Sequence, residues 1–393
     1  MQSRTVVVAV LGTTQTLAWA SSYYLPAILA GSIGEGIGVP RSWVFGAFTA
    51  ALLISAFAGP YVGRVIDRYG GRGVLMLSNI VLAAGLAALA AATGPVSLFF
   101  AWALLGAGMS LGLYDAAFAT LARLYGHDAR GPITGITLIA GFASTVGWPL
   151  SAYLEHALGW RETCLVWSAL NLFVALPLNR FLLPLPRAAA PAEGAAGFSH
   201  APVTWKPYRE MFLLAFVFGA TWFVTGAMAA HLPRLLELAG ATPWEAVAAA
   251  ALVGPAQVAA RLAEFVVMSR VHPLIPARIA ATLHPAGVLV LLLAGPPGAM
   301  LFVILYGAGN GLLTIARGTV PLAIFGPHGY GARTGLLGAP ARATQALAPM
   351  LFGFMMDGMG VAVIFVSAGL CLAALGALLC LRAGHAPRDV ARG

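Results

Sequence analysis

The chain has 393 residues, of which 60% are hydrophobic and only 9% are charged. A soluble protein carries about 25% charged residues, so this composition excludes an ordinary soluble fold and indicates a protein that crosses the membrane several times. Basic residues outnumber acidic ones by 22 to 13. All but one of the basic residues are arginines grouped in particular stretches, which indicates membrane orientation rather than nucleic-acid binding.

Twelve apolar stretches are long enough to cross a membrane as helices. They lie at 5–30, 42–66, 73–93, 96–124, 131–157, 160–184, 208–238, 243–268, 274–295, 297–322, 332–357 and 360–382. The stretch between the sixth and seventh is rich in Ala, Gly and Pro, which predicts a flexible linker. We therefore expect an all-α polytopic membrane protein with one bundle at 1–184, a cytoplasmic linker at 185–207 and a second bundle at 208–393.

The two halves of the chain repeat one another. Thr134-Gly135 matches Thr334-Gly335, and Pro149 matches Pro349, both at an offset of 200 positions. Such ordered matches predict two six-helix bundles in the same orientation, a parallel repeat, with a binding site between them near the middle of the membrane. Prolines within the spans are expected to bend helices, at positions 26, 149, 233, 255, 340 and 349.

A charged stretch from Gly63 to Arg72 separates the second and third spans and is expected to form a hairpin between them. Its pattern resembles the signature loop of the major facilitator superfamily, carried here by Gly63, Asp67, Arg68, Gly70 and Arg72. The resemblance implies a transporter with twelve helices. It also implies that Asp67 braces the start of the eleventh helix near Arg333, where the positive end of the helix dipole favours a carboxylate.

The basic residues also predict the orientation of the protein. Sixteen of them fall in loops and ends on the side of the N-terminus, and three fall on the opposite side, at Arg41, Arg161 and Arg234. Because basic loops stay in the cytoplasm, we expect a multi-pass protein of the plasma (inner) membrane with both termini cytoplasmic.

The apolar spans contain five ionisable residues, Asp115, Arg261, Glu264, Arg317 and Arg342. Ionisable groups in the membrane are energetically expensive, so each is a functional candidate. Arg261 is the leading candidate for substrate binding, since a guanidinium binds a carboxylate bidentately. Its place on the eighth span resembles that of the arginine in monocarboxylate porters and oxalate–formate antiporters, which implies an organic anion as substrate. The alternative is an arginine that pairs helices or extends toward the membrane surface.

The other four residues each have two interpretations. Glu264 follows Arg261 at i, i+3, so the two can pair, and it is either a proton-carrying acid or half of a salt bridge. Asp115 and Arg317 lie on spans related by the repeat, and they either pair across the halves as a gate or each pair within its own half. Arg342 is either a second anion contact or a partner for an acid near the cytoplasmic side.

Polar and aromatic side chains on several spans are candidates for lining the binding site. We expect substrate contacts from Trp19, Tyr23, Tyr114, Trp222 and Asn310, with Thr14, Gln15, Trp148, Thr225 and His231 as further candidates. A Trp or Tyr in an apolar span is more often a packing or interface residue, and that alternative stays open.

The sequence contains no phosphate-binding loop of the ATPase type, no metal-ligand spacing among its three cysteines, and no pairing of a nucleophile with a base. We therefore expect no enzyme activity and neither a metal nor a cofactor. The expected partners are a small organic anion, protons and the lipid bilayer, with no nucleic acid, and the expected state is a monomer.

The sequence thus predicts a secondary active transporter that moves a monocarboxylate-like anion by alternating access. Proton coupling through Glu264 or Asp115 is part of this prediction. One alternative is a proton-coupled exporter of a neutral or cationic compound, which those two acids would bind. Another is a membrane receptor or scaffold that has the same fold without transport.

Overall fold

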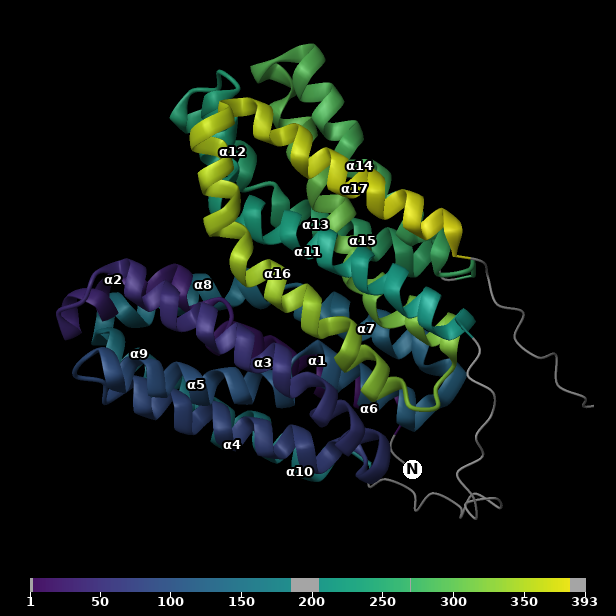
Figure 1. Ribbon diagram of the computed structural model, residues 1–393. Coiled ribbons are helices and arrows are strands. Elements are labelled where there is room, and N and C mark those ends of the chain that lie inside the picture. Colours follow the sequence, from purple (N-terminus) through teal and green to yellow (C-terminus); the bar gives the residue numbers. More distant parts are fainter. Residues whose placement is uncertain (1–2, 185–204, 269, 382–393) are drawn as a thin grey trace, which may run out of the picture.

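The computed structural model describes residues 3–184, 205–268 and 270–381. All regular secondary structure in these ranges is helical. The helices form two bundles, α1 to α10 and α11 to α17, which lie side by side (Figure 1). Most of the predicted linker, 185–204, lies outside the described residues, and α11 begins at Trp205, three residues before the predicted start.

The first bundle makes six passes. They are α1 (Arg4–Ser21) with α2 (Leu25–Ile37), α3 (Arg41–Tyr69), α4 (Gly71–Ala90), α5 (Pro95–Gly112) with α6 (Tyr114–Tyr125), α7 (Arg130–Ala140) with α8 (Ala143–Leu158), and α9 (Trp160–Leu170) with α10 (Leu176–Leu182). A π-helical segment, Asn171–Ala175, joins α9 to α10.

The second bundle repeats this plan. Its passes are α11 (Trp205–Leu238), α12 (Pro243–Ala250) with α13 (Val253–Ala263) and the π-helical segment Glu264–Met268, α14 (Leu274–Ala294), α15 (Ala299–Phe325), α16 (Tyr330–Met359) and α17 (Ile364–Cys380).

Nine helical stretches in the described part of the chain are long and apolar enough to cross a membrane. Two of them, Pro95–Leu158 and Tyr330–Cys380, have 64 and 51 residues, so each contains two passes. The broken pair α1 and α2 adds one more, which gives the twelve predicted passes. The first pass continues to Ile37, beyond the predicted end at 30, because the segment after Ala30 is helical although it contains Gly31, Gly34 and Gly36.

Two of the predicted prolines break helices, and the others lie within them. The gap between α1 and α2 ends just before Pro26, and the gap between α12 and α13 precedes Pro255. A proline ring collides with the carbonyl group four residues earlier, here that of Ser22 and that of Ala251. By contrast, Pro233 lies inside the continuous helix α11.

The charged stretch 63–72 is more helical than the predicted hairpin. α3 continues to Tyr69, and α4 begins at Gly71, so Gly70 alone connects them. Gly70 has φ of +86°, a conformation that favours glycine. The Arg72 side chain bonds to the backbone carbonyl of Arg180 and so attaches α4 to the end of α10.

The two bundles make their most extensive contact where α3 crosses α16 (Figure 1). Asp67 and Arg130 bond across the bundles at one end of the molecule, at the starts of α16 and α7. We call this the arginine-rich end. Small residues let the backbones approach: a Cβ added to Gly63 would overlap the carbonyl group of Gly331. Toward the opposite end, α2 and α8 of one bundle diverge from α12 of the other (Figure 1). The bundles are therefore joined at the arginine-rich end.

We expect Gly63→Ala to destabilise the protein, because its methyl group would meet the backbone of α16. Overpacking of this kind costs about 1–3 kcal/mol. The matched control is Gly73→Ala on α4, where an added Cβ has no neighbour within 4 Å. The check is thermal unfolding of the two purified variants followed by tryptophan fluorescence. A Tm for Gly63→Ala equal to that of Gly73→Ala would contradict the close contact.

Candidate functional site

A helix break places an acid in the interior of the molecule. α5 ends at Gly112 and α6 begins at Tyr114, because Leu113 has an extended backbone with φ −79° and ψ −173°. The Gln15 amide of α1 donates a hydrogen bond to the Gly112 carbonyl, so this carbonyl group at the break has a partner. Asp115 consequently lies in the first turn of α6, where the helix dipole favours a carboxylate.

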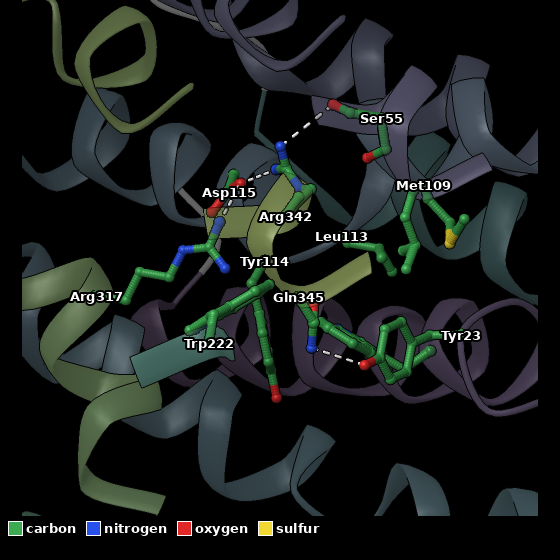
Figure 2. A pocket seen from close by; sticks show the side chains of 12 residues that line it. Tyr23, Ser55, Met109, Leu113, Tyr114, Asp115, Trp222, Arg317, Arg342 and Gln345 are labelled. Atoms are coloured by element: carbon green, nitrogen blue, oxygen red, sulfur yellow. Dashed lines mark hydrogen bonds and ion pairs between the residues drawn. The ribbon is translucent and has the colours of Figure 1, made fainter. Parts of the chain in front are cut away.

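Asp115 accepts hydrogen bonds from two arginines of the other bundle (Figure 2). Arg317 of α15 donates from Nη2 to Asp115 Oδ2 over 2.8 Å. Arg342 of α16 donates from Nη2 to the same oxygen, and its Nη1 donates to the Ser55 carbonyl of α3 over 3.2 Å. The structure thus pairs Asp115 and Arg317 across the halves rather than within them, and it gives Arg342 an acid partner.

This cluster carries a net positive charge, since one carboxylate serves two guanidinium groups. The side chains of Asp115, Arg317 and Arg342 are 11%, 6% and 7% exposed, so solvent screens them little. Arg317 Nε and Nη1 have no hydrogen-bond partner among the described residues. Buried charges require compensation, so the cluster is suited to bind one more negative group.

A cavity between the bundles adjoins this charged cluster (Figure 2). Its volume in this conformation is about 20 Å³, which is room for a water molecule or two, so a larger ligand requires the lining side chains to move apart. The predicted contacts Trp19, Tyr23, Tyr114 and Trp222 all line it. The Arg317 guanidinium lies over the Trp222 ring, 3.8 Å from its centroid, a cation–π contact that fixes the direction of its donors.

Arg261 lies elsewhere, at the contact between α13 and α7. It is buried and is not among the residues that line the cavity. Its Nη1 donates to the Thr137 carbonyl of the first bundle over 3.3 Å, and Gly141 leaves space for the guanidinium. Within the described residues, it forms no ion pair with an acid, and its Nε has no partner. Arg261 therefore connects the bundles as an uncompensated positive charge.

Glu264 does not form the predicted pair with Arg261. It instead accepts a hydrogen bond from Arg130 Nη2 of the other bundle over 3.0 Å, and another from the Thr134 hydroxyl over 3.4 Å. Glu264 begins the π-helical segment, whose wider turns alter the angular offset on which an i, i+3 contact depends. Arg130 also donates to the Met268 carbonyl over 2.8 Å. These bonds fasten the start of α7 to the end of the eighth pass.

The connection that follows this pass contains a histidine. His272 Nδ1 accepts a hydrogen bond from the Leu274 backbone N–H over 3.3 Å. Burial, reinforced by the charges of Arg130 and Arg278, lowers the pKa of His272. The neutral ring that accepts this bond is consequently favoured at neutral pH.

Asp67 of the first half connects the two bundles as Glu264 of the second half does. Its two carboxylate oxygens accept hydrogen bonds from the backbone N–H groups of Gly331 and Ala332, both over 2.9 Å. The start of α16 is thereby braced by Asp67, as the resemblance implied, while Arg333 bonds to carbonyl groups of its own half at Phe325 and His328. At the offset of 200, the start of α16 corresponds to the start of α7, so Asp67 and Glu264 bind repeat-related helix starts.

The remaining candidates have structural partners outside the cavity lining. Asn310 accepts a hydrogen bond from Thr225 over 3.0 Å, and His231 Nε2 contacts the Pro349 carbonyl at 2.7 Å. Thr14 donates to the Leu11 carbonyl, and Trp148 packs against Tyr24. In residues 3–184, 205–268 and 270–381, no three His, Cys, Asp or Glu side chains are grouped as metal ligands.

Sequence reasoning missed several lining residues. They are Leu52, Ser55, Met109, Leu113 and Gln345. Gln345 donates to the Tyr23 hydroxyl over 2.7 Å, which is a further contact between the bundles. It follows Arg342 by three positions, so the helical period places it on the same face, and this was the signal available in the sequence.

Comparison with known proteins agrees with this architecture. The sequence matches the family described as Major Facilitator Superfamily over residues 9–315. It is also 29% identical over 367 residues to a Thermoproteus tenax protein described as "Uncharacterized 38 kDa protein in 23S RNA operon". That alignment covers 92% of this chain and 91% of the relative.

Two solved transporters share the fold at low sequence identity. The human organic anion transporter MFSD10 (TETRAN) superposes with a TM-score of 0.73 at 18% identity, over 96% of this chain and 100% of that one. The E. coli fucose:proton symporter FucP superposes with a TM-score of 0.75 at 14% identity, over 96% of this chain and 99% of that one. A second FucP structure, in the outward conformation, superposes with a TM-score of 0.71 at 14% identity, over 95% of this chain and 98% of that one.

The family match extends over most of the chain, from the first pass into the tenth. The twelve passes and the repeated six-helix bundles agree with it. The protein is therefore a multi-pass membrane protein that belongs to the Major Facilitator Superfamily.

Proposed function

We propose that the protein is a secondary active transporter of a small organic anion that works by alternating access. The observation that carries this proposal is the charge of the central cluster, in which Asp115 serves both Arg317 and Arg342 beside a cavity. An anion would compensate the remaining positive charge. Arg261, with no acid partner in the described part of the chain, adds to the positive potential between the bundles.

Proton coupling through Asp115 is part of the proposal. Both arginines donate to Oδ2, and Oδ1 has no hydrogen-bond partner among the described residues. A proton on Asp115 would neutralise the carboxylate and release both guanidinium groups for a substrate anion. Glu264, held by Arg130 and Thr134, has a connecting role in this scheme rather than a proton-carrying one.

The alternative of a cationic cargo has less support. It requires a free acid at the site, whereas Asp115 and Glu264 are each paired with arginine. Two similar structures are consistent with the leading proposal: MFSD10 is described as an organic anion transporter and FucP as a proton symporter. At 18% and 14% identity, they support the fold directly and the substrate class only by analogy.

We also propose that the arginine-rich end faces the cytoplasm in the plasma membrane, because positively charged loops are retained there. The connections at Asp67 and Glu264 would then close the cytoplasmic side. The conformation described here would be the outward-facing one, which is also the conformation given for one FucP structure.

The first test is anion rescue of Asp115→Asn. Removing the carboxylate leaves Arg317 and Arg342 without compensation, a change that costs about 3–5 kcal/mol in buried ion pairs. We expect a lower Tm in detergent, and we expect benzoate or acetate to raise the Tm of this variant more than that of the wild type.

The matched control is Asp128→Asn, which removes an ion pair with Arg4 whose aspartate is 77% exposed. Exposed pairs contribute roughly 0–1 kcal/mol, so this variant should unfold like the wild type with no anion dependence. If Asp115→Asn were equally stable and equally insensitive to anions, the cluster would not be an anion site.

The second test is uptake of labelled monocarboxylates into proteoliposomes, with protein-free liposomes to subtract diffusion of the neutral acids. We expect an inward proton gradient to stimulate uptake by the wild type and to have no such effect on Asp115→Asn. Arg317→Ala and Arg342→Ala should each lower uptake by about ten-fold or more, since bonds to charged groups contribute about 1.5–3 kcal/mol.

The control for this second test is Arg234→Ala, whose side chain is 64% exposed and pairs with exposed Asp357. It should transport like the wild type. Wild-type uptake at the same rate with and without the proton gradient would contradict proton coupling. Wild-type rates of uptake by Arg317→Ala would contradict a role for the central cluster in substrate binding.

A further inference from the structure

The cavity between the bundles has two chemically different sides. On one side, Arg317 and Arg342 hold Asp115 (Figure 2). The rest of the lining is mostly aromatic or apolar and includes Trp19, Tyr23 and Tyr114. A ligand that satisfies both sides must carry its negative charge at one end and an apolar body at the other.

The charged side accepts one negative group. While Asp115 is ionised, the cluster has two positive charges and one negative charge, and a single carboxylate restores neutrality. A second carboxylate on the same ligand would lie against the aromatic side, where desolvation of a charge is costly. The aromatic and apolar lining opposite the cluster therefore favours a monocarboxylate over a dicarboxylate.

The aromatic side is built around Trp19. Its ring lies 5.1 Å from Tyr23 and 5.0 Å from Tyr114, centroid to centroid. Tyr114 in turn stacks on Phe118 at 5.2 Å. Aromatic pairs at such distances gain attraction beyond their buried area. An aromatic ring on a ligand can form the same kind of pair with this lining, which a saturated chain of equal size cannot.

Two buried polar atoms on this side are unpartnered within the described part of the protein. They are Trp19 Nε1, a donor, and Gln345 Oε1, an acceptor, and both residues are more than nine-tenths buried and line the cavity. Buried polar groups are almost always hydrogen-bonded. A hydroxyl group both accepts and donates, so a hydroxyl on the ligand is the simplest group with the capacity to bind either atom.

We infer that the substrate class is an aromatic monocarboxylate whose ring carries a hydroxyl group. This inference rests on the proposed anion transport and specifies the chemical class of the transported anion. The carboxylate binds Arg317 and Arg342, the ring packs against Trp19 and Tyr114, and the hydroxyl bonds to Trp19 Nε1 or to the Gln345 amide.

The test is calorimetric titration of the purified full chain with ligands that differ in one property. Benzoate is compared with cyclohexanecarboxylate, which has the same charge and a similar size but no aromatic ring. We expect benzoate to bind about five-fold more tightly, in line with measured aromatic pair energies. The ortho, meta and para isomers of hydroxybenzoate are compared with benzoate, and at least one should gain about five-fold from a hydrogen bond. Terephthalate, with two carboxylates, should bind more weakly than benzoate.

Two variants test which residue binds the hydroxyl group and so increases the affinity. Trp19→Phe keeps an aromatic ring and removes the indole N–H, and Gln345→Met removes the amide. At least one of them should bring the affinity ratio of hydroxybenzoate to benzoate close to one. The matched control is Trp244→Phe on α12, whose tryptophan is 80% exposed and lies outside the cavity lining, and it should keep the wild-type ratio.

The outcomes separate this inference from the proposed function. Equal binding of benzoate and cyclohexanecarboxylate, or no gain for any hydroxybenzoate, would overturn the inference and leave anion transport in place. Wild-type ratios in both cavity variants would overturn it as well. If no carboxylate in the panel binds, the anion proposal and this inference fall together.

Discussion

The structure depends on one shared carboxylate. Asp115 of the first bundle is held by Arg317 and Arg342 of the second; the two arginines are buried, and the Asp115 side chain is 11% exposed. An ion in a low-dielectric interior requires an opposite charge or hydrogen bonds to polar groups. The helix break at Leu113 presents Asp115 at a positive helix end, and the stacking of Arg317 on Trp222 directs its guanidinium. The cluster is therefore both the link between the bundles beside the cavity and the source of its positive charge.

The distribution of these charges between the bundles affects how the two bundles can separate. Both arginines belong to the second bundle, and the first bundle contributes one charge, the Asp115 carboxylate, together with the Ser55 carbonyl group. An anion that replaces Asp115 on the arginines would remove this electrostatic link without leaving the arginines unpaired. In the proposed cycle, substrate binding and separation of the bundles are thus linked by competition for the same donors. The connections at Asp67 and Glu264 must open as well, and the repeat places them at corresponding helix starts.

Much of the fold could be predicted because apolar length and repeated motifs are local properties of the chain. The passes end within a few residues of the predicted limits in most cases, and Asp67 braces α16 as the resemblance implied. The partner of Glu264 was predicted wrongly, since spacing within one helix does not reveal that Arg130 approaches from the other bundle. The break at Leu113 also escaped prediction, because neither proline nor a polar turn marks it. Arg261 was expected to lead the site because of its guanidinium chemistry and the resemblance of its place on the eighth span, whereas its position against Thr137 depends on how the bundles pack.

The most direct test is to locate a bound carboxylate. A crystal structure of the wild type with an iodinated benzoate would place the ligand by the anomalous signal of iodine. We expect the carboxylate within hydrogen-bond distance of Arg317 and Arg342, with one of their bonds to Asp115 lost. A ligand bound at Arg261, or with its carboxylate away from every guanidinium group, would contradict the central role of the cluster.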